Sequence, residues 1–93
     1  MPSSAVRWHT VSPEALTLRE LDDELAVRNA MTGSTHLLQP LAAEALTLLM
    51  EAGNGMTAAE LADRLGDGAA GGIAVMESLL NEFKRLGLAE PRD

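Results

Sequence analysis

Apolar and polar residues alternate over the N-terminal part of the chain with a period of two, which is typical of β-strands. The first such run, residues 6–11, suits a short edge strand or an extended arm. Its Trp8 would either cover the core, as tryptophan commonly does, or stay exposed as a contact residue. Residues 1–5 before this run are predicted to form a flexible tail.

The next segment carries two conflicting signals. Ser12, Pro13 and Glu14 are typical of a helix start, because they offer an N-cap hydroxyl, a first-turn proline and a first-turn acid. The residues after them alternate with a period of two, however, and the acidic run 21–25 resembles a turn between strands. We therefore predict a strand over Leu16–Glu20, with a helix as the alternative.

Residues 25–39 have the pattern of a β-hairpin with a turn built on Thr32-Gly33-Ser34. Alternation places Leu25, Val27 and Asn29 on one face of the first strand and Ala26, Arg28 and Ala30 on the other, while Thr35, Leu37 and Gln39 alternate with His36 and Leu38 on the second. Pro40 cannot donate a ladder hydrogen bond and suits a first helical turn, so the sheet should end there. We expect this hairpin to present an open edge at which another chain can bind.

The rest of the chain has helical patterns. A helix is predicted over Leu41–Ala52, ended by Gly53-Asn54-Gly55, with a buried face of Ala42, Ala45, Leu46 and Leu49. Thr57 and Glu60 have the spacing of a capping box, and they begin a short helix whose core side is Leu61, Ala62 and Leu65. Residues 66–72 are rich in glycine and predict a loop.

The last helix is predicted from Gly72 to Leu86, with Gly87 as its stop and residues 88–91 trailing. Its apolar residues span an arc of roughly 160°, against the roughly 100° that packs one side of a surface helix. They are Ile73, Val75, Met76, Leu79, Leu80, Phe83 and Leu86. One margin, formed by Val75, Leu79 and Leu86, is either left for a partner or covered by strands or the C-terminal tail.

Composition narrows the class of protein. The 93 residues are enough for one small domain, and 46% are apolar, although Trp8 and Phe83 are the only aromatic residues. Without cysteine there are no disulfides, thiolate metal sites or cysteine nucleophiles. No apolar run approaches the roughly 20 residues that cross a bilayer, and no signal peptide is visible, so we expect a cytoplasmic protein away from membranes.

A net charge of −7 and scattered basic residues argue against nucleic-acid binding. Candidate chemistry is equally sparse: His9 and His36 lack a second ligand at metal spacing, and Asp22-Asp23-Glu24 lacks the remaining positions of a calcium loop. The glycine-rich loop has no Lys-Ser/Thr of a phosphate loop. Ser34 and His36 would share a face, yet no third group or oxyanion site accompanies them. We predict a binding protein that is not an enzyme and uses no cofactor or metal.

From the hairpin onward the sequence resembles the PqqD family of peptide chaperones, most of all the branch encoded with a kinase related to HPr kinase. The resemblance rests on Asn29-Ala-Met-Thr-Gly-Ser-Thr-His-Leu-Leu38, the early Trp8, the small-residue helix Leu41–Ala52, Met56–Ala62 and the final Leu86-Gly-Leu88. It covers most of the chain. It implies a small winged-helix-like α+β domain with a three-stranded antiparallel sheet followed by three helices.

The resemblance also implies a function. Such domains bind the leader segment of a ribosomally made precursor peptide as a strand added to the third strand, and present it to a peptide-modifying enzyme. On this sequence the edge strand would be Thr35, His36, Leu37 and Leu38, and the facing helix wall Val75, Met76, Leu79, Leu80 and Phe83. Nothing in the sequence indicates pyrroloquinoline quinone as the product, so the prediction covers peptide binding alone.

Two alternatives remain. Residues 57–86 also resemble a helix-turn-helix, which would make the protein a winged-helix DNA-binding transcriptional regulator, although the last helix carries a mixed set of charges. An open strand edge could instead pair with a second copy and form a homodimer.

Overall fold

The computed structural model describes residues 6–11, 13–65 and 72–92, and these form a small α+β domain with two three-stranded antiparallel sheets and three helices. The predicted tail 1–5 and most of the predicted glycine-rich loop lie outside the described residues. In chain order the strands are β1 (Arg7–Thr10), β2 (Leu16–Leu21), β3 (Glu24–Asn29), β4 (Ser34–Leu38), β5 (Met56–Thr57) and β6 (Ala89–Arg92). The helices are a short 3-10 turn (Pro13–Ala15), α1 (Pro40–Glu51), α2 (Ala58–Leu65) and α3 (Ile73–Leu86).

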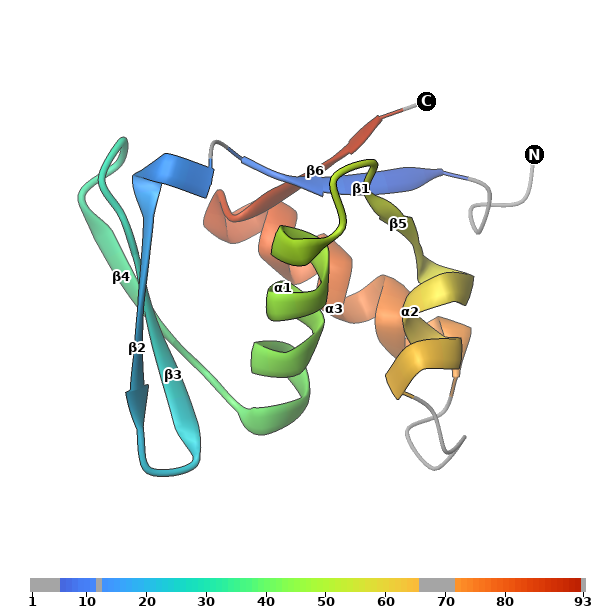
Figure 1. The fold of residues 1–93 in the computed structure, drawn as a ribbon, viewed down its shortest axis with the longest axis horizontal. Helices are drawn as coiled ribbons and strands as arrows, with labels where there is room; N and C mark the ends of the chain where they lie inside the picture. Colours follow the sequence, from blue (N-terminus) through green and yellow to red (C-terminus); the bar gives the residue numbers. More distant parts are fainter. Residues whose placement is uncertain (1–5, 12, 66–71, 93) are drawn as a thin grey trace.

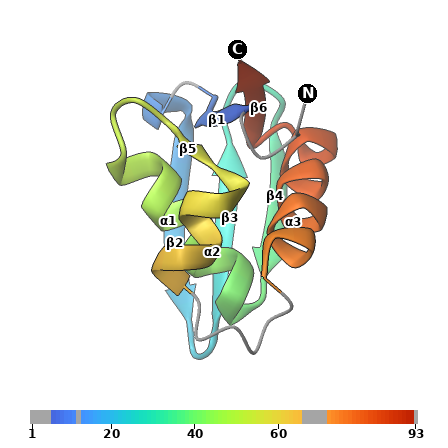
Figure 2. The same ribbon diagram turned by 90° about the vertical axis from the view of Figure 1, so that its right-hand side faces the viewer.

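The two sheets pack around the helices from different sides. Strands β2, β3 and β4 form an upright sheet at the left of Figure 1, and β5, β1 and β6 form the second sheet across the top. Helix α1 contacts both sheets, while α3 packs against α2 and β6. Figure 2 shows α1 and α3 on opposite sides of the molecule, with the β2–β3–β4 sheet behind them.

The second sheet corrects three predictions. The run 6–11 does not form an edge strand or an arm, because β1 lies in the middle of its sheet with β5 and β6 on either side. Residues 88–91 do not trail, since most of them belong to β6. The expected order of three strands before all helices is also incomplete, because β5 follows α1 and β6 follows α3. Proline 91 is compatible with β6 because β6 is an edge strand.

Both of the conflicting signals that begin near Ser12 are confirmed, one after the other along the chain. The proline-led segment makes one 3-10 turn, and the strand predicted over Leu16–Glu20 follows immediately as β2. Asp22 and Asp23 then form the turn to β3, with Asp22 at a positive φ of 53°. Aspartate tolerates this left-handed region better than most residues.

The strand alternation is confirmed on β3 and β4. Leu25, Val27 and Asn29 are buried, and their partners across the ladder are Leu38, His36 and Ser34. The opposite face, which includes Arg28 and Leu37, points away from the helices and is exposed. The first strand of the hairpin therefore lies inside the sheet, and the second lies at an edge of it.

The predicted helices are confirmed, with ends that differ by one residue; on the core side of α2, Leu61 is buried and Ala62 and Leu65 are half-buried. Helix α1 begins at Pro40, and its buried residues are Ala42, Ala45, Leu46 and Leu49, as the periodicity predicts. The capping box at α2 forms both of its hydrogen bonds, since the amides of Thr57 and Glu60 each donate to the other residue's side-chain oxygen at 3.0 Å. Gly87 ends α3 in the left-handed conformation. Trp8 is buried at 7% exposure and covers the core.

The loop between α1 and β5 depends on the glycine at position 55. Gly55 has a φ of +76°, and a Cβ there would lie 2.6 Å from the Trp8 carbonyl oxygen. Gly33 has the same φ, but nothing lies within 4 Å of a Cβ at that position. We expect Gly33→Ala to cost about 1–2 kcal/mol from backbone strain alone.

Gly55→Ala adds a clash with backbone to the same strain, so we expect it to lower the free energy of unfolding by about 3 kcal/mol or more. Urea unfolding of both variants measures the difference. Equal losses for the two variants would mean that β1 does not approach the loop this closely.

Candidate functional site

Strand β4 has only one strand neighbour among the described residues, which is β3. The direction of its backbone groups follows from one hydrogen bond: the Ala30 amide donates to the Ala15 carbonyl at 2.8 Å, which continues the β2–β3 register. Residues of an antiparallel strand direct their N–H and C=O groups to alternate sides. Ala26, Arg28 and Ala30 therefore direct theirs to β2, and the residues between them direct theirs to β4.

The same rule applied across the β3–β4 register assigns the backbone of β4. His36 pairs with Val27 and Leu38 pairs with Leu25, so their N–H and C=O groups point toward β3. Thr35 and Leu37 point theirs toward the open edge. The four backbone groups of these two residues are the ones that an added strand would meet.

The side chains of β4 separate into two faces. Thr35 and Leu37 lie on the outer face of the sheet, and Leu37 is 58% exposed. Leu38 is buried in the core, and His36 is half-buried on the same inner face. Of the four predicted edge residues, two thus offer backbone and side chain to a partner, and two anchor the strand.

His36 is half-buried on the inner face of β4. Its Nε2 atom is buried and has no hydrogen-bond partner among the described residues. On α3, the hydrogen bond from Arg85 lowers the pKa of the Glu82 carboxyl, and the positive charge of Arg85 lowers it further. Figure 2 shows β4 on the same side of the molecule as α3.

Only some residues of the predicted helix wall lie where a partner could contact them. Val75 and Leu79 are half-buried, as is Leu86 at the margin of the same face. Met76, Leu80 and Phe83 are at most 1% exposed and belong to the hydrophobic core. The wide apolar arc of α3 is therefore used mostly inside the domain, where α2 and the C-terminal strand β6 cover much of it.

Asn29 ties the hairpin to the end of α3, and the sequence analysis did not assign it this role. Its Nδ2 donates to the Gly87 carbonyl at 2.9 Å, and its Oδ1 accepts from the Met31 amide at 2.9 Å. The residue is 2% exposed and is the buried polar side chain of the core. An inward-facing asparagine beside a turn was the signal that could have indicated such a link.

Removing the Asn29 side chain leaves the Gly87 carbonyl and the Met31 amide without these partners. We expect Asn29→Ala to lower the free energy of unfolding by about 1–3 kcal/mol, the usual cost of unpaired buried groups. Arg28→Ala, next to it on the exposed face, is the control and should change little. A loss for Asn29→Ala no greater than for Arg28→Ala would contradict this role.

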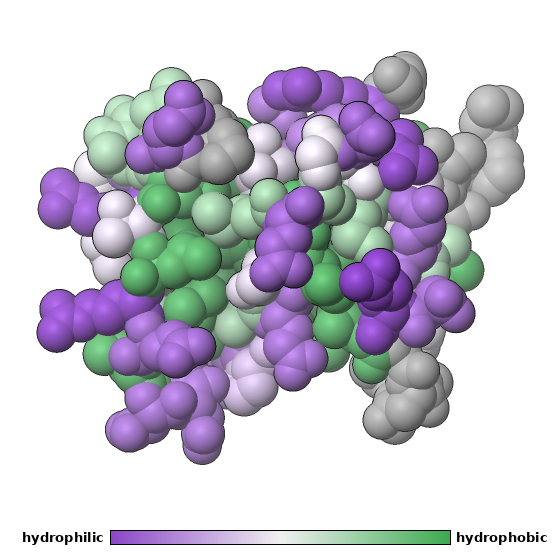
Figure 3. All heavy atoms as spheres, in the orientation of Figure 1, coloured by the Kyte–Doolittle hydropathy of each residue, from purple (hydrophilic) through white to green (hydrophobic). Residues whose placement is uncertain are grey.

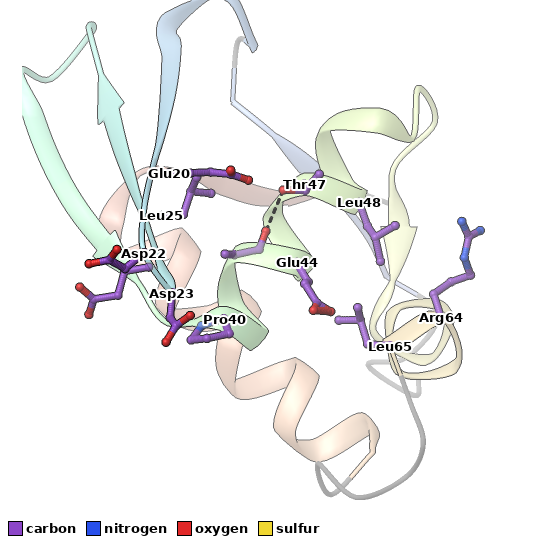
Figure 4. A pocket seen from close by; sticks show the side chains of 12 residues that line it. Glu20, Asp22, Asp23, Leu25, Pro40, Glu44, Thr47, Leu48, Arg64 and Leu65 are labelled. Atoms are coloured by element: carbon purple, nitrogen blue, oxygen red, sulfur yellow. Dashed lines mark hydrogen bonds between the residues drawn. The ribbon is translucent and has the colours of Figure 1, made fainter.

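A second concave surface lies on the inner face of the same sheet, near the β2–β3 turn. A cavity of about 550 Å³ opens between the β2–β3 turn, α1 and the end of α2. Figure 4 shows Glu20, Asp22 and Asp23 on the sheet side and Glu44, Leu48 and Leu65 on the helix side. The turn predicted for the acidic run is confirmed, but the groove beside it could not be predicted because its walls come from three separate segments.

Membrane-spanning helices and metal sites are two further features that the described residues could contain. No described helix is long and apolar enough to cross a membrane. In the same part of the chain, no three histidine, aspartate or glutamate side chains are grouped as metal ligands would be.

Comparison of the chain with protein-family models, with curated proteins and with solved structures gave no match.

Proposed function

We propose that this protein is a non-catalytic peptide chaperone that binds the leader segment of a ribosomally made precursor peptide and presents it to a peptide-modifying enzyme. The open edge of β4 carries the proposal. Strand addition needs a row of unpaired backbone groups with side-chain contacts alongside it. Thr35 and Leu37 supply the backbone groups, and the exposed Leu37 side chain supplies an apolar contact.

The neighbouring part of α3 supports the same site. An added strand would lie about 4.8 Å beyond β4, on the side away from β3. Val75, Leu79 and Leu86 are half-buried on α3, so apolar side chains of a peptide could bury area that is now partly solvated. The wall in this proposal is narrower than the one the resemblance implies, because Met76, Leu80 and Phe83 are already in the core.

The finer fold assignment belongs to this proposal. We take α1, α2 and α3 with the β5–β1–β6 sheet to be a winged-helix arrangement and the β2–β3–β4 sheet to be its peptide-binding addition. A chaperone that binds a ribosomally made precursor peptide would act in the cytoplasm, which is where we expect this protein to be located.

The direct test is a titration of the ¹⁵N-labelled protein with leader peptides of short open reading frames beside its gene. We expect amide shifts concentrated in residues 35–39 and along the Val75–Leu86 face of α3. Shifts confined to other segments would contradict the proposal. Light scattering in the same experiment shows whether the β4 edge pairs with a second copy when no peptide is present.

The rival function, a DNA-binding regulator, shares the winged-helix arrangement and predicts a different result. The exposed residues of α3 include Asn81, Lys84 and Arg85 but also Glu82, whose carboxylate is paired with Arg85. Fluorescence anisotropy with duplex DNA at low salt separates the two functions. Tight, salt-sensitive binding would favour the regulator, because counterion release dominates DNA affinity.

A further inference from the structure

The inner face of β2 is less covered than the rest of its sheet. Helix α1 packs on β3 and β4, so the end of β2 and the β2–β3 turn stand clear of it. The uncovered part of the sheet forms one wall of the groove of about 550 Å³. In Figure 3 a hydrophobic area lies between the sheet and α1, with hydrophilic side chains gathered around its lower end.

The lining of this groove has an apolar part and a charged rim. The apolar part consists of Leu25, Pro40, Ala43, Leu48 and Leu65, while the five rim carboxylates are Glu20, Asp22, Asp23, Glu24 and Glu44. Arg64 is the one basic residue that lines it. The described ion pairs of the chain involve other carboxylates, namely those of Glu60, Glu82 and Glu90.

These charges leave the groove with an unbalanced negative potential. Glu24 accepts one hydrogen bond, from Gln39 Nε2 at 2.9 Å, but that neutral donor does not cancel its charge. Carboxylates gathered on one rim repel one another and attract cations of complementary geometry. Leucines at the base favour a ligand that also has an aliphatic side chain to bury.

We propose that this groove docks a short basic segment of a partner protein, with Lys or Arg side chains on the acidic rim and one aliphatic side chain among Leu25, Leu48 and Leu65. A second copy of this chain does not fit that description. Its basic residues are scattered, Lys84-Arg85 is the only adjacent pair, and Arg85 is already paired with Glu82. The proposal does not depend on peptide binding at β4, because Thr35 and Leu37, whose backbone groups form the open edge, do not line the groove.

The test uses a capped synthetic peptide with a central leucine between pairs of lysines, and a second peptide with glutamates in place of the lysines. We expect the lysine peptide to shift the methyl signals of Leu25, Leu48 and Leu65 and the amides of the β2–β3 turn, saturably and less at high salt. The glutamate peptide should give no such shifts. The amides of Thr35 and Leu37, which point to the open edge of β4, should stay unchanged with both peptides.

A matched pair of α1 variants tests the rim. Glu44 lines the groove, whereas Glu51, which is also exposed, lies at the end of the same helix and does not line it. We expect Glu44→Lys to weaken binding of the lysine peptide about fivefold to tenfold, since an exposed ion pair contributes up to about a factor of five and reversal adds repulsion. Glu51→Lys should change it less than twofold.

Three results would overturn the docking proposal: no shifts from the lysine peptide at millimolar concentration, equal shifts from both peptides, or equal weakening by both variants. These results leave the β4 proposal intact, because Glu44 is not among the residues proposed to bind the leader peptide and leader-peptide binding can be measured on the same samples. Conversely, loss of leader binding with an intact response to the lysine peptide would contradict the β4 proposal alone.

Discussion

Leu37→Pro is expected to weaken leader-peptide binding at least tenfold while the sheet stays folded. Proline removes an N–H group that points to the open edge, and its ring occupies the space in which the added strand would lie. The ladder to β3 uses His36 and Leu38, so its hydrogen bonds remain, and edge strands tolerate proline at such positions. Calorimetric titration should show affinity at least tenfold lower, since one lost hydrogen bond and a blocked contact together exceed about 1.4 kcal/mol.

Glu20→Pro is the matched control for this substitution. Glu20 has the same position on the other edge strand, β2, where its backbone points away from β3 by the same alternation. It should leave leader binding unchanged. If Glu20→Pro removed binding and Leu37→Pro did not, strand addition would take place at β2, and the assignment of the site to β4 would be wrong.

Phe83→Ala is expected to lower the free energy of unfolding by about 3–5 kcal/mol, the usual cost of deleting a buried aromatic ring. Phe83 is 0% exposed and belongs to the hydrophobic core, so its removal leaves a cavity there. A domain of this size has a total stability of roughly 5–15 kcal/mol. The variant should therefore be marginal or unfolded at 37 °C, as measured by urea or thermal unfolding.

Leu79→Ala is the control on the same helix. Leu79 is half-buried, so its truncation should cost clearly less than that of Phe83. Equal and small losses for the two variants would show that Phe83 is not a core residue. It would then be available to a peptide as part of the helix wall, as the family resemblance implies.

The features that could be predicted from the sequence are those with local signals. The capping box of α2, the buried face of α1 and the β3–β4 alternation each depend on residues within one or two turns of chain. Strands β5 and β6 were missed for the opposite reason. Met56–Thr57 is too short to show a period, and Ala89–Arg92 contains a proline, so both become strands only because β1 lies between them.

The candidate site, like the fold, could be predicted only in part from the sequence. The hairpin and its end at Pro40 could be predicted from the residues, whereas the choice of β4 as the edge strand came from the family resemblance. The apolar arc of α3, by contrast, does not say which of its residues face the core, because that depends on how α2 and β6 pack against it. The acid-rimmed groove joins residues from 20 to 65 and has no signal in any single segment.

The central claim is that a peptide adds to β4 as a strand, and amide hydrogen exchange tests it most directly. On addition of a leader peptide, the amides of Thr35 and Leu37 should become protected, because only these two point to the open edge. His36 and Leu38 should change little, since their amides already point toward β3. Protection of Leu18 and Glu20 on β2 instead, or binding that protects neither edge, would contradict the account.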